Sequence, residues 1–543
     1  MEIGHSLLDI GHSLMIKKNA PPASDSKLVA ILDIGARAIR CDVAELRTGG
    51  GATILESLQK AVSLGKDTFG EGRIDPASIE ACVEILKGFR HVLDEYGITQ
   101  PEQIRAVATS SVREAQNRDA FLDRITVGAG INVEVLEDSE VEHLIYLALD
   151  DLLEHEPALR HGDVLAVEAG GGTTRVLLLR DGYVVYSGAF RLGALRMRES
   201  LGLEETPAER VCEVLDAHIH RTVNQMLELI PAGAAPVFVA LAGDTETALR
   251  SLVPGWKTAE TARIPLPASH LAETVVRTPT DELIRRHHLP PQEAETAGQA
   301  LLTFDRIARS FGAREILMTA RSMRRGLLLK MTGIPSAMAR YGEQLAHSAR
   351  ELGRKYRFDE KHAVHVSVLS LRLFRELQPE HGLGPYEEGL LRTAALLHDI
   401  GSFVNIGSHH KHSMYLIGNS EIFGLPRRDL NIVALVARYH RRAMPQRSHP
   451  EYLALDRESR LTISKLAAIL RVADALDRSH LQHVRHLQCE RDGRNFEITV
   501  TDLDDVTLER AALRDKADLF EGIFGYPVVL RTAASQKGTM FHE

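Results

Sequence analysis

The spacing of apolar residues changes along the chain, and the change divides it into an α/β part and a helical part. Residues 27–46, KLVAILDIGARAIRCDVAEL, follow the pattern of an apolar strand, a turn at 33–38 and a second strand. Residues 164–179, VLAVEAGGGTTRVLLL, repeat this plan around three glycines. Two such units, about 135 residues apart, predict a duplicated α/β fold whose turns face each other across a cleft.

Helical spacing appears between these units and dominates later in the chain. Residues 76–97, PASIEACVEILKGFRHVLDEYG, predict a helix that ends at Gly97. Residues 341–479 contain only helical patterns, and the tail from Leu487 returns to strand, helix and strand. The expected parts are a flexible leader (1–26), two α/β subdomains (27–145 and 146–335), a helical domain (336–486) and a small α/β cap (487–543).

The composition is that of an ordinary globular protein, with 44% apolar and 26% charged residues. A net charge of −9 gives no electrostatic footprint for duplex nucleic acid. No apolar run reaches the roughly 18 to 20 residues that span a bilayer, so a soluble protein without membrane contact is expected. Cys41, Cys82, Cys212 and Cys489 form no Cys-x-x-Cys pair, which argues against a zinc ribbon or disulfide framework and favours the reducing cytoplasm.

The glycine run of the second unit suggests a ligand. A tight glycine turn directs successive backbone N–H groups into one concavity, which suits phosphate oxygens. Gly170, Gly171 and Gly172 therefore predict a phosphate-binding loop. A plain β-hairpin is the alternative that the glycines alone leave open.

A histidine and an aspartate, His398 and Asp399, interrupt the apolar run LLRTAALLHDIG of the helical part. A buried carboxylate is costly unless it is paired or binds a metal ion, so a metal is the simplest explanation. His362 and Asp474 stand in two further apolar helices. His365, three residues after His362, is an alternative ligand because it shares that helix face.

Several segments resemble the exopolyphosphatase and guanosine pentaphosphate phosphatase (Ppx/GppA) family, in its long form with a C-terminal HD-type domain. They are VATSSVREAQNRDAFLDRI, AGGGTT, RLGALRM, HKHSMYLIGNSEIFG and RYHRRA, in that order. The resemblance implies an actin-like (ribonuclease H-like) N-terminal half, a homodimer, and release of terminal phosphate from polyphosphate or an alarmone.

The first cleft loop departs from the family pattern in its side chains. The family's Asp-x-Gly-Ser-Asn-Ser is replaced by Asp33, Gly35 and then Ala36, Arg37 and Ala38. One segment resembles the family's catalytic glutamate motif, but it has Val141 at the position of the glutamate. Valine cannot activate water. Two glutamates flank it and are candidate bases if the register shifts by one residue: Glu140 and Glu142.

The second loop has also changed, because Glu168 replaces the family's aspartate and Arg175 replaces an acid. Mg²⁺ would have to bind at Glu168, beside a guanidinium that opposes it. The remaining groups suit holding an anion better than hydrolysing one, although a vestigial cleft is equally consistent with them. The predicted phosphate-binding residues are Asp33, Gly35, Arg37, Gly170, Gly171, Gly172, Thr173 and Arg175.

The histidines of the helical part resemble the His, His-Asp, Asp signature of the HD phosphohydrolase superfamily. Further histidines fall where two-metal members carry them, at 409, 410, 412 and 440. Imidazole with carboxylate suits two ions of Mn, Fe, Co, Ni or Zn, bridged by Asp399. Lys411, Arg438, Arg441 and Arg442 are available to neutralise phosphate. The predicted ligands are His362, His398, Asp399, His412, His440 and Asp474, with His398 and Asp399 catalytic.

These motifs predict a metal-dependent phosphohydrolase that acts in its HD-like half on polyphosphate, an alarmone or a nucleotide. Two alternatives remain open at the level of sequence. One keeps exopolyphosphatase activity in the N-terminal cleft, with Glu140 or Glu142 as base and Mg²⁺ near Asp33 and Glu168. The other is a non-catalytic sensor of a phosphate ligand.

Overall fold

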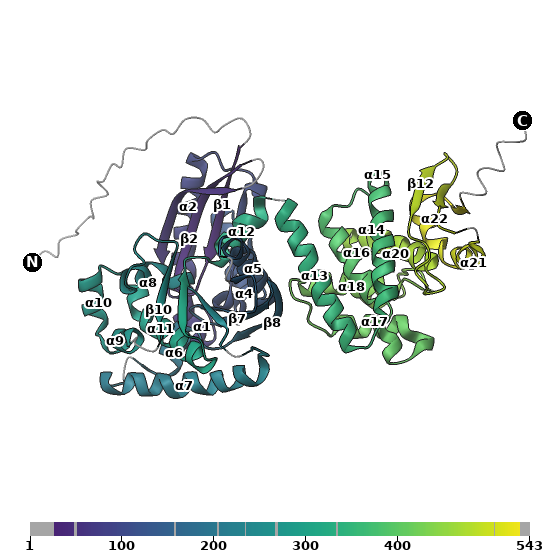
Figure 1. The fold of residues 1–543 in the computed structure, drawn as a ribbon. Coiled ribbons are helices and arrows are strands. Elements are labelled where there is room, and N and C mark those ends of the chain that lie inside the picture. Colours follow the sequence, from purple (N-terminus) through teal and green to yellow (C-terminus); the bar gives the residue numbers. More distant parts are fainter. Residues whose placement is uncertain are drawn as a thin grey trace, which may run out of the picture.

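A computed structural model shows an α/β half and a helical half on either side of helix α13 (Pro335–Lys355) (Figure 1). Residues 1–25 of the expected leader lie outside the described residues, and so does Arg442. The described ranges are 26–47, 51–156, 159–203, 206–233, 235–266, 270–332, 335–441, 443–503 and 505–532.

The first sheet has five strands in the order β3-β2-β1-β4-β5. β1 pairs antiparallel with β2 and parallel with β4. The predicted strand–turn–strand at 27–46 is confirmed as β1 and β2. The strands are β1 (Ser26–Ile34), β2 (Ala38–Arg47), β3 (Ala52–Ala61), β4 (Ile104–Ala108) and β5 (Val133–Val135). The helices are α1 (Leu64–Glu71), α2 (Pro76–Glu95), α3 (Ser110–Arg113), α4 (Arg118–Ala129) and α5 (Asp138–His155).

The second sheet repeats this order as β8-β7-β6-β9-β11, with β10 added antiparallel at its edge. β6 pairs antiparallel with β7 and parallel with β9, as β1 does with its neighbours. The expected duplication is therefore present in the topology. The strands are β6 (Asp163–Ala169), β7 (Thr174–Arg180), β8 (Tyr183–Phe190), β9 (Val237–Leu241), β10 (Thr261–Pro265) and β11 (Glu315–Thr319). The helices are α6 (Ala194–Ser200), α7 (Ala208–Leu229), α8 (Glu246–Leu252), α9 (Leu271–Arg277), α10 (Thr280–His287), α11 (Pro291–Ser310) and α12 (Met323–Thr332).

Helix α5 crosses the division expected between residues 145 and 146, so the chain has no break there. Its apolar side chains, among them Val141, Leu144 and Ile145, belong to one core with Val164 and Leu177 of the second sheet. Because these residues recur at helical spacing, burying them against β6 and β7 stabilises a single continuous helix. The helix thus reaches from the cleft to the surface that faces the helical half.

The helical half and the C-terminal cap share one hydrophobic core, which includes Leu397, Leu470, Phe496 and Phe520. No helix in the described ranges has both the length and the apolar character needed to cross a membrane. The helices are α14 (Glu360–Glu376), α15 (Gln378–His381), α16 (Pro385–Leu397), α17 (His409–Gly418), α18 (Arg427–Arg438), α19 (Pro450–Leu453) and α20 (Arg457–Leu476). The cap has β12 (Leu487–Arg491), β13 (Phe496–Val500), α21 (Thr507–Lys516), α22 (Asp518–Phe524) and β14 (Val528–Thr532), with strand order β12-β13-β14.

Specific contacts join the two halves. The fully buried side chain of Gln344 accepts from the backbone N–H of Val184 at 3.0 Å and donates to its carbonyl at 3.1 Å. This amide extends the β8 edge with a side chain from α13. Nearby, the ring of His143 on α5 lies 4.5 Å from that of Tyr341, whose hydroxyl donates to the carbonyl of Gly424. The halves therefore meet through hydrogen bonds and through a tilted contact between the rings of His143 and Tyr341.

Candidate functional site

Two sites can be built from the predicted residues, and the first is the cleft between the glycine loops. Both loops, Val141 of α5 and the start of α12 line a cavity of about 40 Å³, room for a few water molecules. The predicted residues that line it are Asp33, Gly35, Glu168, Gly170, Gly171, Gly172, Thr173 and Arg175.

Arginines pair with the carboxylates that line the cleft. Glu168 and Arg175 are partners in the β6–β7 register, and their side chains lie 3.3 Å apart. In the first α/β subdomain, Asp33 and Arg40 are partners in the β1–β2 register. The guanidinium of Arg40, however, forms an ion pair with Asp244 at 2.6 Å. Burial and the charge of Asp244 raise the pKa of Asp33 to about 6. The oxygens of Glu168 and Asp244 are thus occupied by arginines, which would compete with Mg²⁺ for them.

The glycines of the second loop allow close packing of the backbone. A Cβ at Gly172 would meet the ring of Phe69 at 2.4 Å and Ser110 Oγ at 2.6 Å. The N–H of Gly170 is taken by the carbonyl of Thr173, as in a hairpin turn. The loop therefore has structural reasons for its glycines whether or not it binds phosphate.

Arg37, predicted to bind phosphate, does not line this cavity. Its Nη1 donates to the carbonyl of Gln292 at 2.8 Å and its Nη2 to that of Asp244 at 3.4 Å. Both acceptors lie in the second α/β subdomain. Arg37 therefore links the two α/β subdomains through hydrogen bonds. The pattern of the first loop gave its position but not the direction of its side chain.

Val141 does line the cleft, at the position where the family resemblance places the catalytic glutamate. Glu140 caps its own helix, since its Oε2 accepts from the N–H of Glu137 at 2.9 Å. Glu142 is buried beside Ser187 and Arg175, and its burial raises its pKa to about 7. Neither glutamate is among the residues that line the cleft, because neighbouring positions on a helix point about 100° apart.

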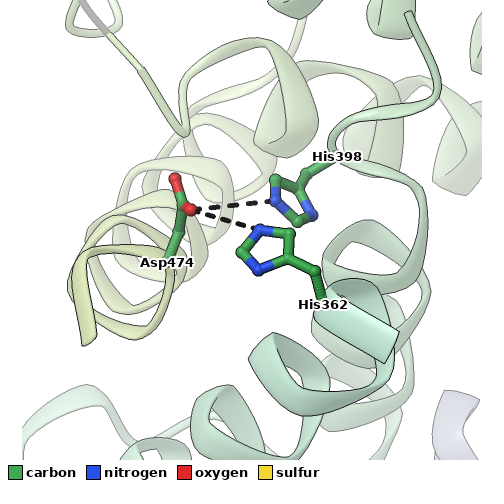
Figure 2. A group of neighbouring side chains, drawn as sticks. All are labelled: His362, His398 and Asp474. Atoms are coloured by element: carbon green, nitrogen blue, oxygen red, sulfur yellow. Dashed lines mark ion pairs between the residues drawn. The ribbon is translucent and has the colours of Figure 1, made fainter. Parts of the chain in front are cut away.

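The second site is a cluster of histidines and aspartates in the helical half. His362 on α14, His398 at the end of α16 and Asp474 on α20 converge from three helices, as Figure 2 shows. Asp474 Oδ1 lies 3.6 Å from Nε2 of His362 and 3.9 Å from Nε2 of His398. These three groups could hold a metal ion, and all three are at least nine-tenths buried.

A second group that could hold a metal ion adjoins the first. Asp399 Oδ1 lies 3.2 Å from Nε2 of His409, 3.4 Å from Nε2 of His440 and 3.8 Å from Nε2 of His398. One carboxylate thus faces histidines of both groups. A carboxylate in this position could contact two metal ions.

In each ring, Nδ1, the nitrogen that faces away from the centre, lies at hydrogen-bond distance from another group of the protein. Nδ1 of His398, His409 and His440 lies 2.6 to 2.8 Å from the backbone carbonyl three residues earlier. Nδ1 of His362 lies 2.8 Å from the carboxylate of Asp477. Such bonds place the proton on Nδ1 and leave Nε2 as the ligand atom. The carbonyls are free to accept because most stand at helix ends.

The carboxylates of the cluster favour a positive charge at His362, and a proton and a metal ion compete for that place. Although burial opposes both shifts, Asp474 and Asp477 raise the pKa of His362 to about 9, and His398 and His440 hold that of Asp399 at about 2. Three buried atoms face the centre without a hydrogen-bond partner: Nε2 of His362, Nε2 of His398 and Oδ1 of Asp399. The donor set of imidazole and carboxylate therefore fits Mn, Fe, Co, Ni or Zn.

The structure brings together five of the six predicted ligands but leaves out His412. His409, the first residue of α17, takes the position next to Asp399 instead. His362, rather than His365, faces Asp474, and Asp477 contacts the far side of His362. Among the predicted cations, Arg441 approaches closely, with Nη1 3.5 Å from Nδ1 of His409.

Sequence reasoning missed two neighbours of the cluster. His480 stacks on His362 with ring centroids 3.6 Å apart and can join His362 and Asp399 in a third ligand group. Lys516 of the cap forms an ion pair with Asp474. No local sequence pattern predicts that either residue lies at the cluster, because both belong to segments that follow α20.

Family models match both halves of the chain. The model described as the Ppx/GppA phosphatase family matches residues 43–333. The model described as Ppx/GppA phosphatase, domain III, matches residues 346–520. The first match spans more than half of the chain and contains Val141 and Glu168 of the cleft. The second contains every residue of the two histidine groups.

Solved structures resemble part of the chain. A Ppx/GppA family member from Aquifex aeolicus is 21% identical with a TM-score of 0.46, over 56% of this chain and 97% of that one. An exopolyphosphatase from Cytophaga hutchinsonii ATCC 33406 is 18% identical with a TM-score of 0.48, over 56% of this chain and 98% of that one. Each likeness reaches little more than half of the present chain.

Proposed function

Because this chain belongs to the Ppx/GppA phosphatase family, we propose that it is a phosphohydrolase, and that its reaction takes place at the histidine cluster of the helical half. Polyphosphate, an alarmone or a nucleotide is the proposed substrate class. The N-terminal cleft is proposed to bind or sense an anion, or to be vestigial, and not to hydrolyse.

The convergence of Nε2 atoms on Asp399 is the observation that carries this proposal. His398, His409 and His440 all direct Nε2 within 3.8 Å of one carboxylate oxygen. Without a cation, Nε2 of His398 and Oδ1 of Asp399 are buried and unpaired, which costs free energy, and Nε2 of His409 lies 3.1 Å from Nε2 of His440. The N-terminal cleft shows the reverse arrangement, because its carboxylates are already paired with arginines.

The proposed residue roles follow from the geometry. His362, His398 and Asp474 would hold one ion, His409 and His440 a second, and Asp399 would bridge them. When bound, two such ions polarise a phosphoryl oxygen and lower the pKa of a water molecule, so that a nucleophile is available at neutral pH. Asp477 keeps the ring of His362 in place. Arg441, whose Nη1 lies 3.5 Å from Nδ1 of His409, is the proposed cation for phosphate charge.

The test measures phosphate release from polyphosphate, guanosine pentaphosphate and nucleoside triphosphates, each with Mn²⁺, Co²⁺ or Mg²⁺. Asp399→Asn removes the bridging charge and is expected to lower the rate at least ~100-fold, beyond the loss typical of outer residues. Glu140→Gln and Glu142→Gln, outside the cleft lining, should keep the rate within about twofold. Full turnover by Asp399→Asn, or loss of turnover in a glutamate variant, would overturn the proposal.

A further inference from the structure

The C-terminal cap contributes one charged side chain to the histidine cluster. Lys516, the last residue of α21, is 8% exposed, and its Nζ forms an ion pair with Oδ2 of Asp474. The other oxygen of that carboxylate, Oδ1, is the one that faces Nε2 of His362 and of His398. The lysine and the histidines therefore divide the two oxygens of Asp474 between them.

A buried arginine holds the backbone of Lys516 in place. Arg471, fully buried on α20 one turn before Asp474, donates from Nε to the carbonyl of Lys516 at 2.6 Å. Its Nη1 donates to the carbonyl of Tyr439 at 3.3 Å, and Tyr439 immediately precedes His440. Its Nη2 pairs with Asp518 at the start of α22. One guanidinium thus links the cap, α20 and the chain next to a histidine of the second group.

We propose that Lys516 is a positioning residue for the metal centre, which directs Oδ1 of Asp474 toward His362 and His398 and keeps the carboxylate from turning. The proposal rests on the proposed function, because it assumes a metal ion in the first group. It goes further in making the cap part of that centre: the helical domain alone would lack the residue that fixes one of its ligands.

The opposite effect of the lysine charge provides a sharp test. A cation close to the centre repels a metal ion, so a lysine that acted only through its charge would weaken metal binding, and its removal would tighten it. If the lysine orients Asp474, its removal should weaken metal binding. A ligand that loses its outer hydrogen-bond partner typically binds metal about 10- to 100-fold more weakly. The sign of the change in affinity therefore distinguishes the two roles.

The experiment titrates the metal-free full chain with Co²⁺ and follows visible absorbance, which reports the ligand geometry around the ion. Lys516→Met is expected to weaken binding about 10- to 100-fold and to change the Co²⁺ spectrum. Lys516→Arg, which keeps charge and donor, should restore the affinity to within a few-fold. Arg514→Met removes an exposed charge from the same helix and should leave affinity and spectrum unchanged.

Melting temperatures of the metal-free proteins check that each variant is folded. Lys516→Gln is titrated beside Lys516→Met in case the latter does not fold, and the same weakening is expected of it. Unchanged or tighter binding in both variants would overturn the positioning role. If the unaltered protein binds no metal, the proposed function fails as well, whereas tight binding that is insensitive to Lys516 contradicts only the role of the lysine.

Discussion

Each histidine of the two groups uses one ring nitrogen for the protein and directs the other at the centre. The carbonyls of Ala395, Ile406 and Ala437 accept hydrogen bonds from Nδ1 of three rings, so these rings cannot turn without losing a hydrogen bond. Because the rings are held before a metal binds, little conformational entropy is lost on binding. The cluster would therefore be preorganised for the proposed metal ions.

The difference between His409 and His412 is a test at this scale. His409→Ala removes a ligand of the second group and is expected to reduce metal content from two ions to about one per chain, and to lower phosphate release about 100-fold. His412→Ala, outside both groups, should keep both properties. Metal content by mass spectrometry of the purified variants decides, and equal losses in both would contradict the assigned ligands.

Sequence reasoning found most of this cluster because His398 and Asp399 interrupt an apolar run, where buried polar groups need a partner. It chose His412 from HHKHS, whereas His409 is the one that lies beside Asp399, because three histidines within one helical turn point in three directions. Which one faces Asp399 depends on where α17 begins, and that is set by the short helix η5 (Ile406–Ser408) before it. Packing, and not local pattern, decides that register.

At the scale of elements, helix α5 connects the cleft with the interface between the halves. Val141 lines the cleft, and His143, two residues later, packs against Tyr341 and Phe423 of the other half. The sequence predicted strands, helices and the repeated unit well, because their apolar periods are clear. It divided α5 at residue 145, since nothing in a helix's own pattern shows that both α/β subdomains pack on it.

The contact between α13 and β8 can be tested through Gln344. Gln344→Leu leaves the buried N–H and carbonyl of Val184 without partners, which should destabilise the protein by about 2 to 4 kcal/mol. Hydrogen exchange should show the loss at β8 and α13. Ser348→Ala, which removes a hydroxyl that Gln344 also contacts, is the control and should cost less than about 1 kcal/mol. If both substitutions lowered the free energy of unfolding equally, the hydrogen bonds to Val184 would not have the stabilising effect assigned to them.

For the whole molecule, the interface contains a buried titratable group. Burial lowers the pKa of His143 from 6.5 to about 3. The folded protein therefore resists protonation that the unfolded chain accepts, so stability is complete above pH 6.5 and falls as the pH drops toward 3. This acid sensitivity is a property of the joined halves, since Tyr341 and Phe423 help to bury the ring.

His143→Phe is expected to remove part of that sensitivity. The melting temperature of the unaltered protein should fall further between pH 7.5 and pH 5 than that of the variant, because phenylalanine has no proton to gain. His220→Gln, at an exposed position, serves as the control and should match the unaltered protein. Parallel pH profiles for His143→Phe and the unaltered chain would contradict the assignment.

The central claim is that the chemistry of this family member lies in its helical half and depends on metal. Metal analysis of the purified protein, beside the His398→Ala, Asp399→Ala double variant, tests it most directly. The account predicts one or two transition-metal ions per chain in the unaltered protein and none in the variant. Absence of metal after supplementation, or metal retained by the variant, would contradict it and direct attention to the N-terminal cleft.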